Sequence, residues 1–168
     1  MTKYKAEITV KDYGTVTLLL DPSYAPITVE NFVILAKSGF YNGLTFHRIM
    51  RGFMIQGGDP LGNGMGGSDE TIKGEFIANA VNNPLSHKRG VISMARSSRP
   101  NSASSQFFIC DADDTFLDGQ YAAFGWVTDG MDTVDKIAAD ARPVDGNGTI
   151  PSFAQPVIET ITVSPEGE

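Results

Sequence analysis

Short strand-like segments run through most of the chain, and only two segments have the periodicity of a helix. From Tyr4 to Leu20, alternating polar and apolar residues predict a hairpin that turns at Asp12-Tyr13-Gly14. Apolar or β-branched runs predict further strands at 45–57, 91–95, 106–110, 121–127 and 157–163. Many short strands with two helices are typical of a β-barrel or a sandwich that helices cap.

The two helical segments are expected at 28–39 and 131–139, where apolar residues recur every three or four positions. Thr28 is the expected N-cap of the first helix, and Gly39 is expected to cap its C-terminus. Between the strands, residues 58–90 are rich in Gly, Asn and Pro. We expect this segment to cross the surface with few apolar anchors.

Size, charge and cysteine content exclude several classes of partner and binding site. A chain of 168 residues fits a single domain, 1–168, with a full core. Its net charge of −7, from 13 basic and 20 acidic residues, argues against nucleic acid or anionic membrane as a partner. One cysteine and two histidines provide no disulfide framework and too few ligands for most metal sites, so we expect no metal or cofactor. With no signal peptide or membrane-length apolar run, a cytoplasmic monomer is expected.

The most unusual stretch extends from Phe46 to Asp59 and reads as two strands around a turn at Arg51-Gly52. It places a guanidinium (Arg48) and an amide (Gln56) among large apolar side chains. A second stretch, 104–110, has a similar character, and its polar and aromatic side chains at alternate positions share one face of a strand. An apolar pocket with a few fixed polar groups is the usual composition of a small-ligand site.

Four features invite other interpretations. Gly62 to Gly67 matches G-x-G-x-x-G, but no buried helix follows it, so we predict a flexible loop rather than a nucleotide site. His47 is expected to be a structural histidine beside Phe46, and His87 to be solvated in a polar loop. Cys110, in an apolar strand, is expected to be a small buried hydrophobe rather than a nucleophile.

Several stretches closely resemble the signature sequences of the cyclophilins, the peptidyl-prolyl cis-trans isomerases. They are Phe46-His47-Arg48-Ile49, Gly52-Phe53-Met54-Ile55-Gln56-Gly57-Gly58-Asp59, Val91-Ile92-Ser93-Met94-Ala95, Ser105-Gln106-Phe107-Phe108-Ile109 and Phe116-Leu117-Asp118-Gly119-Gln120. The resemblance runs from about Ile8 to Val163. It implies a mostly β fold, a closed eight-stranded antiparallel β-barrel capped by two α-helices, with a substrate groove on the outer face.

The same resemblance implies the site residues. It makes Arg48 the catalytic residue, supported by Gln56. Substrate binding is assigned to Phe53, Met54, Gln56, Ala95, Arg96, Gln106, Phe108, Phe116, Leu117 and Tyr121. Phe116 stands where a tryptophan is usual and Tyr121 where a histidine is usual, as in the bacterial branch of the family.

The implied partners are proline-containing peptides and unfolded or folding proteins. Cyclosporin is expected to bind weakly, because Phe116 has no indole N–H to donate. The alternative that stays open is a non-catalytic proline-peptide-binding or chaperone module on the same fold. Arg48 and Gln56 are both present, which favours the enzyme.

Overall fold

The computed structural model describes residues 1–167 and has eight strands in that range. They are β1 (Tyr4–Val10), β2 (Gly14–Leu20), β3 (Phe46–Met50), β4 (Met54–Gly57), β5 (Val91–Met94), β6 (Phe107–Cys110), β7 (Ala123–Asp129) and β8 (Ile158–Pro165). The helices of the same range are α1 (Pro26–Lys37) and α2 (Met131–Asp140), with short 3₁₀ turns η1 (Ile77–Asn79), η2 (Thr115–Leu117) and η3 (Ser152–Ala154). None of the helices in residues 1–167 is long and apolar enough to cross a bilayer.

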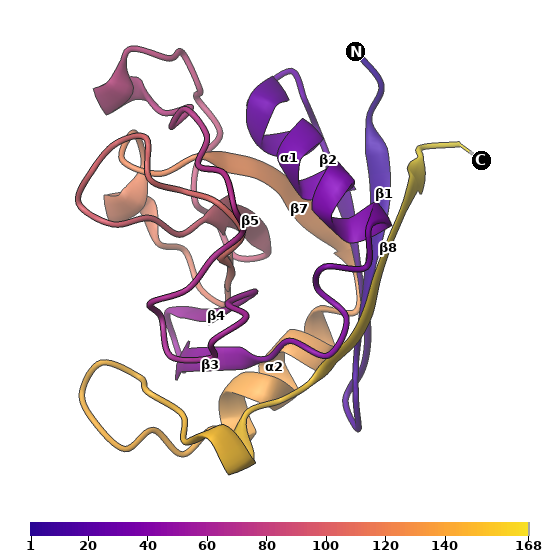
Figure 1. Ribbon diagram of the computed structural model, residues 1–168, viewed down its shortest axis with the longest axis vertical. Helices are drawn as coiled ribbons and strands as arrows, with labels where there is room; N and C mark the ends of the chain where they lie inside the picture. The colour runs from indigo at the N-terminus through magenta and orange to yellow at the C-terminus, as the bar shows by residue number, and fades with distance from the viewer. Residues whose placement is uncertain (168) are drawn as a thin grey trace.

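All eight strands described belong to one antiparallel sheet, in the order β3-β4-β6-β5-β7-β2-β1-β8. The sheet curls into a half-barrel, and Figure 1 shows α1 and α2 toward its opposite ends. The expected mostly β fold with two helices is confirmed. Full closure of a barrel is not seen, because the edge strands β3 and β8 share no ladder within residues 1–167, although a single bridge joins Thr45 to Val157 just before them.

The two faces of the curled sheet carry separate apolar clusters. Phe107 and Ile109 of β6 point into the main core, where Phe107 packs edge-on against Phe32 of α1 at 5.6 Å between ring centroids. Their neighbours Phe108 and Cys110 point outward, because successive side chains of a strand face opposite sides. They form a small outer cluster with Met54 and Leu117. This outer cluster is where the substrate groove was expected.

Helix α1 begins earlier than the sequence suggested. Thr28 is not the N-cap; the helix starts at Pro26, whose missing N–H costs nothing in the first turn. The backbone N–H and hydroxyl of Thr28 instead donate to Oε1 of Glu75, over 2.6 and 2.8 Å. The carboxylate of Glu75, in a distant loop, therefore accepts a first-turn N–H that a local N-cap side chain was expected to satisfy. At the other end, Gly39 has φ of +79° and ends the helix as predicted.

The 58–90 segment is more firmly anchored than its composition indicated. The expectation of few apolar anchors was incomplete, because Phe76 is buried in the main core and polar residues are buried beside it. The Asn83 amide donates to the carbonyl oxygens of Glu75 and Ala123 over 3.0 and 2.9 Å. Polar anchors of this kind leave no apolar pattern in the sequence.

Candidate active site

A row of four residues crosses the outer face of the sheet on neighbouring strands. In the strand register Arg48 of β3 lies opposite Gln56 of β4, Gln56 lies opposite Phe108 of β6, and Phe108 lies opposite Ser93 of β5. Residues in register on one face have Cβ atoms about 4.5–5.5 Å apart. The sheet itself thus brings the guanidinium, the amide and the aromatic ring together, although 60 positions separate Arg48 from Phe108.

A cavity of about 120 Å³ opens beside this row. Its floor is apolar and buried, made by Met54, Phe108 and Leu117. It is lined by Arg48, Phe53, Met54, Gln56, Ala95, Arg96, Phe108, Leu117 and Tyr121. Nine of the eleven residues singled out from the sequence therefore line one cavity, whose volume suits a single small side chain or ring.

Arg48 is held at the edge of this cavity by groups on either side. Its Nε–H donates to the carbonyl oxygen of Asn147 over 2.7 Å, and its NH1 donates to Oε1 of Gln56 over 3.1 Å. The guanidinium carbon lies 5.9 Å from the centre of the Phe53 ring. Two fixed contacts hold the planar group in one orientation, and its half-buried position leaves one side open to the groove.

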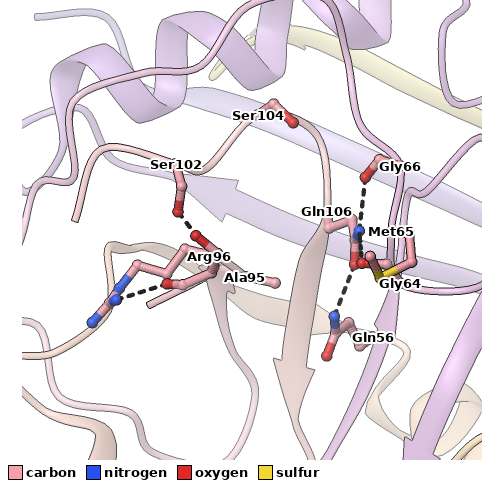
Figure 2. Close-up of a pocket in the computed structure, with 10 residues that line it drawn as sticks. Gln56, Gly64, Met65, Gly66, Ala95, Arg96, Ser102, Ser104 and Gln106 are labelled. Carbon is pink, nitrogen blue, oxygen red and sulfur yellow. Dashed lines mark hydrogen bonds between the residues drawn. The ribbon is translucent and has the colours of Figure 1, made fainter. Parts of the chain in front are cut away.

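Gln106 lies in a second cavity of about 220 Å³ beside the first. Its Oε1 accepts a hydrogen bond from the Gln56 amide over 2.9 Å. Its Nε2 donates to the carbonyl oxygens of Gly64 and Gly66 over 3.0 and 2.8 Å, as Figure 2 shows. Both ends of the amide are engaged, so Gln106 supports Gln56 and Arg48 at least as directly as it could contact a ligand.

Arg96 lies between the two cavities and is also fixed. Its guanidinium carbon lies 4.6 Å from the centre of the Phe76 ring and 4.8 Å from that of Tyr121. Its NH2 donates to the carbonyl oxygen of Gln120 over 2.6 Å. The backbone N–H of Ala95 already donates to Gln106 O over 3.0 Å, so it has a partner in the sheet.

Phe116 is the one expected residue that lines neither cavity. Its side chain is 70% exposed, and its ring lies 5.6 Å from that of Phe53. The turn η2 turns the neighbouring Leu117 inward instead, as side chains of adjacent positions in a tight turn diverge. Phe116 is therefore placed at the outer rim, where a larger ligand would meet it.

The Gly62–Gly67 motif has a structural role at this site. The Asp59 carboxylate accepts backbone N–H groups of Leu61, Asn63 and Gly64 over 2.8, 3.1 and 2.6 Å. Burial would raise the pKa of Asp59, but these backbone hydrogen bonds outweigh it and lower that pKa. A Cβ on Gly66 would collide with Asp59 and Leu61. The glycines thus allow the tight approach that presents loop carbonyls to Gln106.

The two histidines differ from each other. His47, which was expected to be a structural histidine, is buried, and its ring nitrogens have no hydrogen-bond partner among residues 1–167; burial lowers its pKa. The expectation that His87 is solvated was wrong, because the residue is fully buried and both ring nitrogens are hydrogen-bonded.

In the part of the chain that the structure describes, the single cysteine and the metal-ligand residues show no further site. Cys110 is buried as expected, and burial raises the pKa of its thiol. Within residues 1–167 no three His, Cys, Asp or Glu side chains are grouped to hold a metal ion.

Sequence reasoning missed the loop that holds Arg48 from outside. Residues 145–149 supply the Asn147 carbonyl, and the Gly148 carbonyl accepts the N–H of Ile49 over 2.9 Å. The Asp145-Gly146-Asn147-Gly148 sequence indicates a tight turn. It gave no sign of where that turn would dock.

Comparison with known proteins identifies a family. Residues 5–163 match the family model described as cyclophilin type peptidyl-prolyl cis-trans isomerase/CLD. A Helicobacter pylori protein named peptidyl-prolyl cis-trans isomerase is 48% identical over 126 residues, which cover 74% of each chain. A Rhizopus delemar protein named peptidyl-prolyl cis-trans isomerase-like 1 is 46% identical over 125 residues, again 74% of each chain. A Cryptosporidium parvum cyclophilin crystallised in the presence of the dipeptide Ala-Pro aligns with a TM-score of 0.83 at 32% identity, covering 95% of this chain and 98% of that one.

Proposed function

The chain belongs to the cyclophilin family of peptidyl-prolyl cis-trans isomerases, and we propose that Arg48 is the residue through which it accelerates rotation of X-Pro bonds. The observation that carries this assignment is the position of the guanidinium. It is fixed by Asn147 and Gln56 at the mouth of an apolar cavity of about 120 Å³. We propose that this cavity receives the proline ring.

The chemistry needs a hydrogen-bond donor rather than a nucleophile. Rotation about the prolyl bond breaks amide resonance, and the barrier is ~18–20 kcal/mol. In the twisted state the proline nitrogen becomes pyramidal and gains a lone pair. A donor aimed at that nitrogen binds the twisted form better than either planar form, and this difference in binding is the source of catalysis.

Arg48 is suited to this role by what its neighbours leave free. A guanidinium has five N–H donors. Three hydrogen bonds from it are present within residues 1–167, to Asn147 O, Gln56 Oε1 and Met50 Sδ. Two donors remain for a substrate. One preorganised donor is typically worth about 2.7–4 kcal/mol, or ~10²–10³ in rate.

The substrates we propose are proline-containing peptides and folding proteins. The apolar floor made by Met54, Phe108 and Leu117 would hold the ring and exclude water, which strengthens a hydrogen bond from Arg48. The second cavity, lined by Arg96 and Gln106 among others, would take residues on one side of the proline while the other side rotates. Phe116 and Tyr121 would contact the chain at the rim.

The remaining sequence predictions form part of the same proposal. We propose that residues 1–168 act as one isomerase domain in which the sheet closes into a barrel. The N–H of Phe46 donates to Pro156 O and that of Ile158 to Leu44 O, over 3.0 and 2.7 Å, which supports closure between β3 and β8. Weak cyclosporin binding, a monomeric state and a cytoplasmic location stay predictions from the sequence.

A refolding assay tests the enzyme against the binding module. The target is a protein whose slow refolding phase is limited by X-Pro isomerisation. We expect the wild-type chain to accelerate that phase at substoichiometric concentration, and Arg48→Ala to lose the acceleration while still binding the unfolded target. Acceleration that survives Arg48→Ala, or that needs a stoichiometric amount of protein, would favour the chaperone module.

A further inference from the structure

Directly behind the proposed proline cavity lies a chain of hydrogen bonds that links the buried Ser93 and His87 to the partly exposed Asp118. His87 Nδ1 lies 3.0 Å from Asp118 Oδ1, and His87 Nε2 lies 2.9 Å from Ser93 Oγ. A carboxylate can only accept, so the ring carries its proton on Nδ1 and donates it to Asp118. Nε2 is then an acceptor, and the Ser93 hydroxyl donates to it. Burial lowers the pKa of His87, against the opposing effect of Asp118, which agrees with a neutral ring.

This Ser-His-Asp arrangement has the hydrogen-bond order of a hydrolase triad, but it cannot act as one. Ser93 and His87 are both fully buried. The Phe108 ring stacks on the imidazole at 6.0 Å between centroids, with an interplanar angle of 15°. A nucleophile must reach a substrate carbonyl. Here the hydroxyl is fully buried behind the cavity floor, on the side of the sheet that carries Phe108, and cannot reach one.

The same histidine packs from behind against two of the residues that line the proline cavity. Its ring packs on the floor residue Phe108 and lies edge-on to Tyr121 at 6.4 Å. Its backbone N–H donates to Asp118 Oδ1 over 2.6 Å, and its carbonyl oxygen accepts the N–H of Asp114 over 2.7 Å. Asp114 and Asp118 flank the turn η2, which carries Leu117. Ser93 lies on β5 in register with Phe108.

We propose that His87 and Asp118 are positioning residues that lock the turn η2 to the cavity floor, so that Leu117 and Phe108 present a fixed surface to the proline ring. This inference rests on the proposed proline cavity. A side chain whose partners are fixed by hydrogen bonds on both sides loses little freedom when a ligand arrives, and preorganisation of this kind is a source of affinity.

The test compares Asp118→Ala with Asp118→Asn by peptide isomerisation kinetics and thermal unfolding. The Asp118 side chain is 36% exposed, so its replacement is better tolerated than that of His87. We expect Asp118→Ala to lower kcat/KM about tenfold, chiefly through a higher KM, because it loosens groups that bind the ground and transition states alike. Asp118→Asn keeps an acceptor oxygen for His87 and should restore most of the loss.

Two controls separate the possible failures. Asp113→Ala removes a neighbouring carboxylate that accepts the N–H of Arg89 and does not touch His87, so its KM should be unchanged. Met54→Ala alters the cavity directly and should raise KM. If Met54→Ala raises KM while Asp118→Ala only lowers the unfolding temperature, the positioning role is wrong and the proline cavity stands. If neither changes KM, both assignments are wrong. Ester hydrolysis that disappears in Ser93→Ala would also overturn the positioning role.

Discussion

NH1 of Arg48 donates to Oε1 of Gln56 over 3.1 Å, and the Gln56 amide in turn donates to Oε1 of Gln106 over 2.9 Å. Because Gln106 is fixed by two loop carbonyls, the guanidinium is positioned through two amides from the 64–66 loop. The amide of Gln56 is therefore expected to matter for rate more than for substrate contact.

Replacement of Gln56 by leucine tests that relay. Gln56→Leu keeps a side chain that fills part of the same space but removes the acceptor for Arg48 and the donor to Gln106. We expect kcat/KM for an Ala-Pro peptide to fall about ten- to a hundredfold, since small displacements of a catalytic group have effects of this size. Unfolding temperature should change little, because Gln56 is only half-buried. An unchanged kcat/KM would show that Asn147 alone holds Arg48.

The loop that holds Arg48 from outside can be tested with a matched pair of glycines. Gly148 has φ of +85°, and a Cβ there would lie 2.5 Å from Met50 Cγ and 2.9 Å from Ile49 O. Gly148→Ala should cost about 1–3 kcal/mol of stability and lower activity, because the loop must shift away from Arg48. A Cβ on Gly146 meets nothing within 4 Å among residues 1–167, so Gly146→Ala should leave both unchanged. Equal behaviour of the two variants in unfolding and exchange assays would contradict this role of the loop.

Asp114 should make stability depend on pH. Burial raises its pKa from 3.8 to about 6, an effect that the neighbouring acids Asp111 and Asp113 reinforce and the Cys110 thiol opposes. The folded state thus favours the protonated form. The stability that Asp114 contributes is therefore fully present below pH 3.8, and it is lost as pH rises through 6. Asp114→Asn should therefore stabilise the protein by about 1 kcal/mol at pH 7.5 and not at pH 4.

Thermal unfolding of the two proteins across pH 4–8 measures this difference. Asp69→Asn is the control, because that side chain is exposed and is not among the acids that act on Asp114, so the slope should not change. If the difference in unfolding temperature between wild type and Asp114→Asn does not vary with pH, the Asp114 carboxyl does not titrate in this range.

The rim position of Phe116 predicts the response to cyclosporin. Its ring is 70% exposed beside Phe53, so Phe116→Trp has room for the larger ring and adds an N–H donor at the rim. We expect at least about a threefold tighter Kd by calorimetry, the gain of one modest hydrogen bond. Phe153→Trp, at a residue 91% exposed on η3, is the control for a tryptophan added elsewhere on the surface. Equal affinity of both variants would remove the rim from the binding site.

The parts of the structure that local pattern determines were predictable from the sequence. The hairpin from Tyr4 to Leu20 forms as predicted, with its strands joined by the turn before Gly14. Alternation within 104–110 predicted that Gln106 and Phe108 share one face, and both lie beside Gln56 on the outer face of the sheet. These features follow from side chains that alternate between the two faces of a strand, and this alternation can be read in a single sequence.

What escaped prediction depends on long-range polar contacts. Glu75 replaces a local cap at Thr28, Asn147 holds Arg48, and His87 connects Ser93 to Asp118. Each partner lies at least 31 positions away or belongs to a loop without periodicity. Hydrogen bonds between such loops leave no trace in composition, so His87 was wrongly expected to be solvated.

NMR exchange spectroscopy of a short Ala-Pro peptide measures whether Arg48 drives isomerisation. Wild type, Arg48→Ala and Arg51→Ala are compared, the last because Arg51 is exposed at the β3–β4 turn outside both cavities. We predict rapid cis/trans exchange with wild type and Arg51→Ala, and a rate ~10²–10³ lower with folded Arg48→Ala. Exchange by folded Arg48→Ala at close to the wild-type rate would contradict the account.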